Sequence, residues 1–128
     1  MFILSAGMPK SGSTLLPLYQ KEILVRGHPQ HGQHELDAAI KDGTINGIGI
    51  FIHDLESRST IEKLLDLSER TGPFVVKTHA PLSPYLYELL LRRQILATYI
   101  HRDPRDVILS AMDHGRRPPD HPARNSYF

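Results

Sequence analysis

The 128-residue sequence predicts a three-layer α/β/α fold in which helices cover both faces of a parallel β-sheet. Two patterns support this prediction. Segments with the composition of strands alternate along the chain with segments that have the caps and spacing of helices. The apolar residues of the strand segments form continuous runs, which is typical of parallel strands buried on both faces. Ligands of such sheets bind beyond the carboxyl ends of the strands, so we expect the functional residues there.

The first half of the chain is predicted to contain two strands and two helices. In order, its segments are a strand at residues 2–6, a glycine-rich loop at 7–12, a helix at 13–26, a polar loop at 28–34, a helix at 35–41 and a strand at 48–52. Gly27 closes the first helix. Pro17 falls near the first turn of that helix, where a missing N–H group costs least.

The second half is predicted mainly from its helix boundaries. Its segments are a helix from Ser59 to Gly72-Pro73, a strand at 74–78, a helix at 83–93, a strand at 95–101, a helix at 103–115 and a loose tail at 116–128. Ser59 followed by Glu62 has the spacing of a capping box. Ser83 and Asp103 each precede a proline, which favours an N-cap followed by proline at the first helical position.

Composition limits the possible functions. The length fits one domain, and 40% hydrophobic with 23% charged residues is ordinary for a globular protein. The absence of cysteine excludes a disulfide framework, a thiolate nucleophile and a zinc–cysteine site. A net charge of +1 argues against nucleic acid as the main partner. No signal peptide or membrane span is visible, so we expect a cytoplasmic protein without a membrane partner. The oligomeric state stays open.

The loop after the first strand has the features of an anion site. A strand, a glycine-rich loop and a helix in succession direct N–H groups toward a phosphate. The spacing Gly7-x4-Gly12 matches the nucleotide P-loop, but Ser13 and Thr14 follow where that motif has Lys and then Ser or Thr. The lysine lies inside the loop, at Lys10. No Walker-B carboxylate ends a strand, so an ordinary ATP or GTP hydrolase is disfavoured. For this loop alone, a purely structural turn is an equal alternative.

Two further strand ends carry polar residues. His79 directly follows a buried strand, and a histidine there can take a proton from an alcohol. Arg102 closes the next strand, and Ser110 follows eight residues later on a helix. An arginine suits a phosphate, although Arg102 could instead pair with Asp103 or Asp106 at the surface. The combination of an anion loop, a base and an arginine at successive strand ends favours a functional site.

Three motifs in this order resemble those of the sulfotransferases that use 3′-phosphoadenosine 5′-phosphosulfate (PAPS). They are Pro9-Lys10-Ser11-Gly12-Ser13-Thr14, Val76-Lys77-Thr78-His79-Ala80-Pro81, and Tyr99-Ile100-His101-Arg102-Asp103-Pro104-Arg105-Asp106-Val107 with Ser110. The resemblance implies a P-loop nucleoside-triphosphate-hydrolase-like fold and a PAPS-binding domain at residues 1–115. Family members usually have about twice this length, so we expect an N-terminal portion or an unusually short member.

The resemblance also implies roles for individual residues. Lys10 would stabilise the leaving phosphate, His79 would deprotonate a hydroxyl or amine acceptor, and Lys77 would support charge in the transition state. The residues implied to bind PAPS are Ser11, Gly12, Ser13 and Thr14 at the 5′-phosphate, and Arg102 and Ser110 at the 3′-phosphate. The implied partner is a small-molecule acceptor, PAPS is the co-substrate, and no metal is expected.

Two alternatives stay open at this point. A truncated, non-catalytic half-domain would bind PAPS or its product adenosine 3′,5′-bisphosphate (PAP) without transferring sulfate. A P-loop small-molecule kinase would need ATP and magnesium, and it would have a lysine directly before Thr14, where this chain has Ser13.

Overall fold

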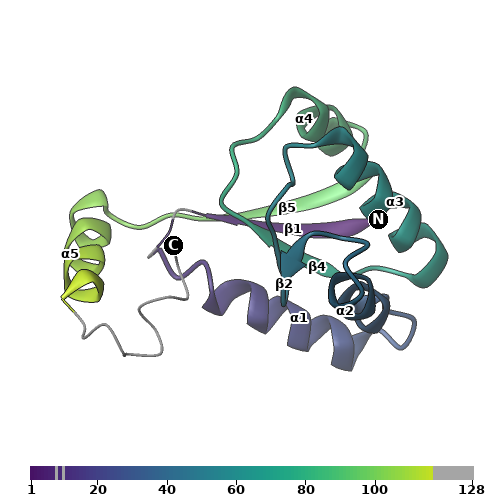
Figure 1. Cartoon of the computed structure of the whole chain (residues 1–128), viewed down its shortest axis with the longest axis horizontal. Helices are drawn as coiled ribbons and strands as arrows, with labels where there is room; N and C mark the ends of the chain where they lie inside the picture. The colour runs from purple at the N-terminus through teal and green to yellow at the C-terminus, as the bar shows by residue number, and fades with distance from the viewer. Residues whose placement is uncertain (8, 10, 117–128) are drawn as a thin grey trace.

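The computed structural model describes residues 1–7, 9 and 11–116 of the chain (Figure 1). Its elements in order are β1 Phe2–Gly7, α1 Leu15–Gly27, α2 Gln33–Lys41, β2 Gly47–Ile48, β3 Phe51–Ile52, α3 Arg58–Thr71, β4 Val75–Thr78, α4 Pro84–Leu91, β5 Ile95–Ile100 and α5 Pro104–Gly115. Strands and helices therefore alternate over most of the chain, as the sequence predicts. The expected loose tail lies outside the described residues from residue 117 onward.

The strands form one sheet in the order β2-β3-β4-β1-β5. β1 is an inner strand that pairs in parallel with β4 and β5, and β3 pairs in parallel with β4. The α/β class with a largely parallel sheet is thus confirmed. The single strand predicted at 48–52 is wrong, because β2 and β3 form a small antiparallel hairpin. The turn between β2 and β3 contains Gly49, whose φ of 59° lies in the left-handed region that residues with a side chain rarely adopt.

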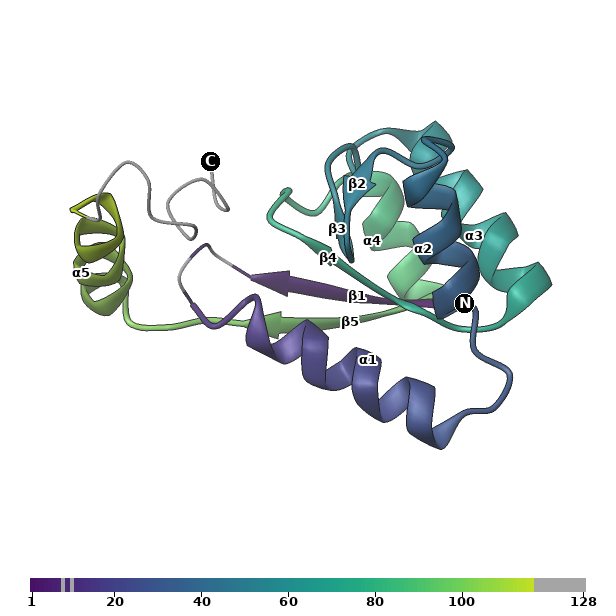
Figure 2. The ribbon, with the colours of Figure 1, turned by 60° about the horizontal axis from the view of Figure 1, so that its bottom comes forward.

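Helices lie on both faces of the sheet. Figure 2 shows α1 below the strands and α2, α3 and α4 above them. The core lies between the sheet and these upper helices, where the stacked rings of Phe2 and Phe74 have centroids 5.9 Å apart. Leu36, Ile61 and Leu86 are buried against this layer from three different helices. This packing fixes β1 and β4, and with them the positions of their carboxyl ends.

The coverage predicted for both faces is incomplete at β5. Leu96 and Tyr99 on this edge strand are 49% and 62% exposed. α5 is joined to β5 by an extended segment and stands apart from the sheet (Figure 1). Its side chains Ile108, Leu109 and Met112 are also exposed. The apolar residues of β5 predict coverage on both faces, but composition alone does not show that β5 is an edge strand.

Two helix caps match the sequence prediction and one does not. The Ser83 hydroxyl accepts a hydrogen bond from the backbone N–H of Leu86 (3.2 Å), and the Asp103 carboxylate accepts one from Arg105 (2.9 Å). The capping box at Ser59 is wrong, because α3 begins at Arg58 with Ser57 as its N-cap. The Glu62 carboxylate instead accepts a hydrogen bond from Arg58 (2.8 Å) one turn earlier.

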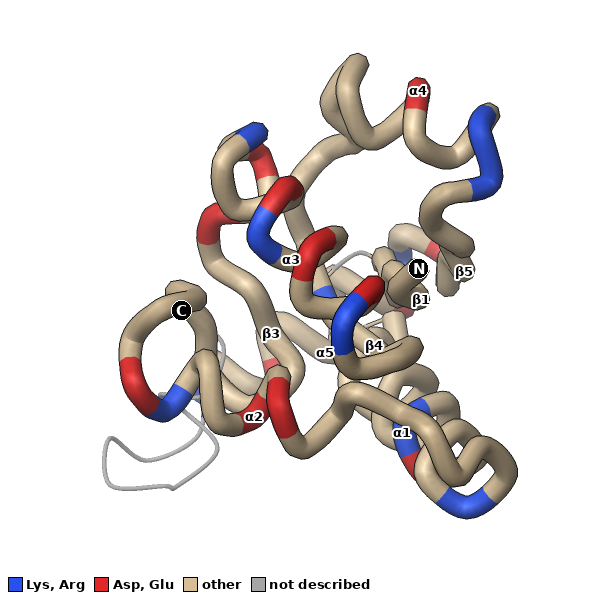
Figure 3. The backbone as a smooth tube through the Cα atoms, turned by 90° about the vertical axis from the view of Figure 1, so that its right-hand side faces the viewer, with Lys and Arg blue, Asp and Glu red and all other residues tan. Residues whose placement is uncertain are grey.

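Charged side chains of both signs are interspersed on the surface. Figure 3 shows both basic and acidic positions along α3. Two pairs on this helix, Arg58–Glu62 and Arg70–Asp66, have the spacing of four residues that brings side chains together on one helix face. Any attraction for an anion must therefore come from local geometry. Among the described residues, no helix is long and apolar enough to cross a membrane.

Candidate functional site

The candidate site lies where β1, β4 and β5 end at the same edge of the sheet. In the parallel register, Ala6 of β1 lies opposite Thr78 of β4, and Gly7 lies opposite Ile100 of β5. The glycine-rich loop leaves from β1, and His79 directly follows β4. Pairing of the strands therefore brings the loop and the histidine together, as the sequence predicts.

Gly7 packs too closely against β5 to carry a side chain. A Cβ atom at this position would lie 2.6 Å from Cγ2 of Ile100 and 2.9 Å from the Ile100 carbonyl oxygen. It would also lie 3.2 Å from Oγ of Ser11. The absence of a side chain therefore allows β1 and β5 to stay paired up to the point where the loop begins.

We expect replacement of Gly7 by alanine to lower the free energy of unfolding by about 1–3 kcal/mol, the usual cost of overpacking a tight site. Chemical denaturation measures the change. Gly27→Ala is the matched control, because a Cβ at that helical glycine meets nothing within 4 Å. Equal stability of the two variants would show that β1 and β5 are not as closely packed as described.

The loop passes directly into the N-terminus of α1. Gly12 has φ of 92°, and its carbonyl accepts hydrogen bonds from the backbone N–H groups of Leu15 (3.0 Å) and Leu16 (3.2 Å). Thr14 is the N-cap and is exposed, yet its side chain makes no capping hydrogen bond to this helix. The aligned peptide dipoles place partial positive charge at the N-terminus of a helix. This turn therefore suits an anion.

The predicted loop residues differ in accessibility. Ser11 and Ser13 are 6% and 5% exposed, whereas Gly12 and Thr14 are exposed. Of these four residues, Gly12 and Thr14 are thus the most accessible to an anion. Lys10, for which the resemblance implies a catalytic role, lies outside the described residues, so its role stays a prediction.

Lys77 on β4 reaches the N-terminus of α1. The residue is only 8% exposed, and its Nζ atom donates a hydrogen bond to the Thr14 hydroxyl (3.1 Å). The same Nζ lies 5.6 Å from the centroid of the Phe51 ring. A lysine charge and the positive end of a helix dipole therefore converge on Thr14, which favours an anion beside them.

His79 is held by the end of β1. Its Nδ1 lies 2.6 Å from the Gly7 carbonyl oxygen. A carbonyl only accepts hydrogen bonds, so Nδ1 donates and the neutral ring carries its accepting lone pair on Nε2. The adjoining turn is fixed because the backbone N–H of Ala80 donates to the Thr78 hydroxyl (2.9 Å). The half-buried ring is thus oriented as a proton acceptor through Nε2.

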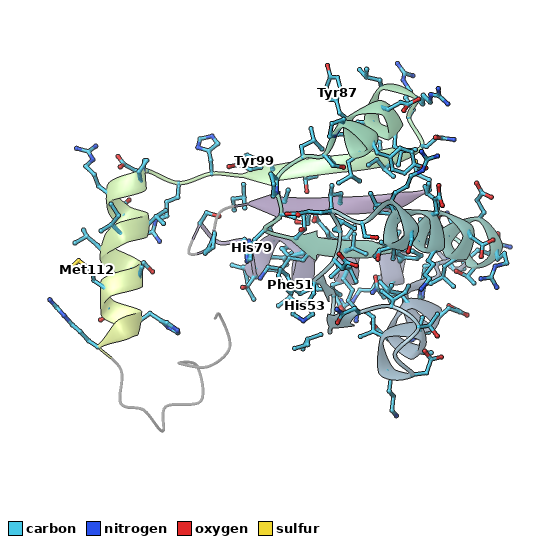
Figure 4. All side chains as sticks on the ribbon, turned by 45° about the horizontal axis from the view of Figure 1, so that its top comes forward. Phe51, His53, His79, Tyr87, Tyr99 and Met112 are labelled. Atoms are coloured by element: carbon cyan, nitrogen blue, oxygen red, sulfur yellow. The ribbon has the colours of Figure 1, made fainter. Side chains whose placement is uncertain are left out.

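Phe51 is a site residue that the sequence did not reveal. Its ring contacts the ring of His79 (centroids 5.3 Å apart) and that of His53 (5.0 Å), and it also lies under Lys77. Figure 4 shows Phe51, His53 and His79 in one group. Phe51 reaches the site because it pairs with Lys77 between β3 and β4. These two strands are far apart in the sequence, so no local sequence pattern predicts the contact.

The third predicted strand end is more open. Arg102 lies two residues after the end of β5 and is exposed, with Nε 3.7 Å from the Asp106 carboxylate. Asp103 pairs instead with the Arg105 guanidinium (2.6 Å). Hydrogen bonds from the Arg105 side chain and backbone lower the pKa of Asp103. Ser110 is partly buried on α5, the helix that stands apart from the sheet (Figures 1 and 2). The structure thus groups His79 and Lys77 with the loop, whereas Ser110 lies on a separate helix.

Comparison with family models gives a match over nearly the whole chain. The family model described as "Sulfotransferase domain" matches residues 2–128. No curated protein and no solved structure gives a significant match to the chain.

Proposed function

The chain belongs to the sulfotransferase domain family, and on this premise we propose that it transfers a sulfuryl group from PAPS to the hydroxyl or amine of a small-molecule acceptor. One observation carries the proposal. The hydrogen bond between His79 and the Gly7 carbonyl sets a proton acceptor on Nε2 at the same sheet edge as the positive N-terminus of α1. Sulfuryl transfer needs such a base beside a site for the phosphosulfate anion.

In the proposed reaction, His79 takes the acceptor proton at Nε2 as the acceptor oxygen or nitrogen forms a bond to sulfur. The bond between sulfur and the bridging oxygen breaks, and its electron pair leaves on the 5′-phosphate of PAP. Lys77 and the N-terminus of α1 stabilise the negative charge that develops on that oxygen. The resemblance implies that Lys10 also stabilises the negative charge on the leaving phosphate.

The described residues fit the phosphosulfate end of PAPS. The exposed turn at Gly12 and Thr14 offers N–H groups, and Lys77 adds a positive charge beside them. Arg102 is exposed, so it is accessible to the 3′-phosphate that distinguishes PAPS from ATP. All of these residues lie within the 1–115 segment that we propose as the donor-binding domain. Lysine and the helix N-terminus balance the donor charge in this proposal.

Replacing Arg102 by alanine is expected to weaken binding of PAP by about 10-fold to 100-fold, the range for a lost hydrogen bond to a charged group. Binding of adenosine 5′-phosphate should change by less than about twofold, because this nucleotide has no 3′-phosphate. Isothermal titration calorimetry measures both. Arg105→Ala is the control, because it removes an equally charged, exposed side chain three residues away that has no proposed role in donor binding. Equal losses for the two nucleotides would argue against a 3′-phosphate role for Arg102.

Thermal unfolding tests the choice of donor. PAP at about 100 times its dissociation constant should stabilise the chain by about 2.7 kcal/mol and raise the melting temperature. ATP with magnesium at the same concentration should do so much less. Stabilisation by ATP with magnesium alone would overturn the proposal and favour a kinase.

A further inference from the structure

One aromatic ring, that of Phe51, contacts both Lys77 and His79. The ring centroid lies 5.6 Å from Nζ of Lys77 and 5.3 Å from the centroid of the His79 ring. Lys77 and His79 are two residues apart at the end of β4, and alternate residues of an extended chain leave the same face. Figure 4 shows the Phe51 and His79 side chains next to each other. A side chain of β3 is therefore packed against both of the groups that β4 contributes to the site.

Strand pairing fixes the position of Phe51. This residue lies opposite Lys77 in the parallel register of β3 and β4, and the Lys77 backbone N–H donates a hydrogen bond to the Ile50 carbonyl (2.6 Å). The next residue, Ile52, is only 1% exposed and belongs to the core. Neighbouring residues of a strand point to opposite faces, so the burial of Ile52 directs Phe51 toward the site.

The face of the Phe51 ring favours a charged Lys77. An ammonium within about 6 Å of the centroid of an aromatic ring is attracted to the ring, and more strongly where water is excluded. Lys77 is 8% exposed, so water screens this contact little. Its Nζ also donates a hydrogen bond to the Thr14 hydroxyl (3.1 Å). The ring and the hydroxyl together hold the lysine charge beside the N-terminus of α1.

The same ring restricts the movement of His79. Its hydrogen bond to the Gly7 carbonyl oxygen, over 2.6 Å, fixes Nδ1 but still allows the imidazole to turn about the line through Nδ1 and that oxygen. The Phe51 ring packs against the imidazole at an angle of 47°, so it opposes this turn. Nε2 of His79 therefore keeps one direction.

We propose that Phe51 is a positioning residue, which holds the ammonium of Lys77 and the imidazole of His79 in one fixed arrangement. This inference rests on the proposed function, because these are two of the groups that act in that reaction. Phe51 has no proton to exchange and no charge, so its effect on the rate comes through its two neighbours. Positioning has a large effect, since a displacement of about 1 Å can lower a rate by about 100-fold.

Substitutions at Phe51 test this role in steady-state kinetics. Phe51→Leu should lower kcat by about 5-fold to 30-fold, the range for a cation–π contact without water, while the affinity for PAP changes by less than about threefold. Phe51→Tyr keeps the ring and should keep kcat within about threefold of the parent. Tyr87→Leu is the matched control, because that ring is 54% exposed on α4, away from Phe51 (Figure 4). A parental kcat in Phe51→Leu, or an equal loss in Tyr87→Leu, would overturn the proposal.

A double-variant cycle tests whether Phe51 acts through Lys77. Residues in contact are not additive, so Phe51→Leu should cost at least about threefold less when Lys77 is already methionine. The same loss of kcat in both backgrounds would show that the ring acts independently of the lysine, contrary to the proposal.

The arrangement of His79 is measured without turnover. Long-range ¹H–¹⁵N NMR spectra of the histidine-labelled chain distinguish the two tautomers of a neutral ring, and loss of signals in His79→Asn assigns them. The parent and Phe51→Tyr should show the form that carries its proton on Nδ1, whereas Phe51→Leu should show a mixture of both. The pure Nδ1 form in Phe51→Leu would contradict an effect of Phe51 on His79.

These measurements also separate the inference from the proposed function. A tautomer that depends on Phe51, in a parent chain that transfers no sulfate, would support the positioning of His79 and contradict the sulfotransferase function. Transfer by the parent, with the same kcat and tautomer in Phe51→Leu, would support the function and contradict the positioning role. Phe51→Met replaces Phe51→Leu if the latter unfolds, because methionine fills irregular space without an aromatic face.

Discussion

Replacement of His79 by asparagine is expected to reduce the rate of sulfate transfer by about 10²-fold to 10⁴-fold, the usual contribution of a general base. The asparagine amide can donate to the Gly7 carbonyl, as Nδ1 of His79 does over 2.6 Å. It has no group that takes a proton at the position of Nε2. The turn after β4 should therefore keep its conformation while the base is lost.

A matched variant tests whether the loss is specific. His53→Asn changes the other histidine that contacts the Phe51 ring, and His53 is exposed. Steady-state kinetics should show a low kcat for His79→Asn only, and both variants should bind PAP and melt like the parent chain. A kcat for His79→Asn within a few-fold of the parent, or an equal loss in His53→Asn, would remove His79 from the role of base.

Replacement of Lys77 by methionine is expected to lower kcat by about 10²-fold to 10³-fold, as removal of one donor to a developing anion does elsewhere. Methionine keeps an unbranched side chain of similar length against the Phe51 ring, where the Lys77 Nζ now lies 5.6 Å from the centroid. It removes the charge and the hydrogen bond to Thr14. The transition state should therefore lose stabilisation without a cavity forming.

Three measurements on this variant separate catalysis from folding. The kcat of Lys77→Met should fall much more than its affinity for PAP, and urea denaturation should show stability equal to or above that of the parent. Lys63→Met is the control. The Lys63 Nζ donates a hydrogen bond to the exposed Thr44 carbonyl and has no proposed role in the site. An unchanged kcat in Lys77→Met would contradict the role of this lysine.

Local signals predicted much of the fold. The N-caps at Ser83 and Asp103 depend on side chains within three residues of the helix start, and the structure has both. The capping box failed because Arg58, one turn before Glu62, binds that carboxylate. The sequence predicts a single strand at 48–52, because composition alone does not reveal a reversal at Gly49.

The site depends more on contacts between distant segments. His79 is predicted because it directly follows a buried strand, and Lys77 because its motif resembles that of the sulfotransferases; strand pairing brings both to the loop. Phe51 was missed because its contacts arise from the pairing of β3 with β4, which no local pattern encodes. The position of Ser110 on a separate α5 follows likewise from the extended chain after β5, whose path no motif predicts.

The most direct test of sulfuryl transfer uses PAPS that carries labelled sulfate and a panel of phenols, alcohols and amines as acceptors. The parent chain should form the labelled sulfate ester and PAP in equal amounts, and His79→Asn should form neither at a comparable rate. Binding of PAP without labelled product from any phenol, alcohol or amine would contradict transfer and identify a non-catalytic domain that binds the donor.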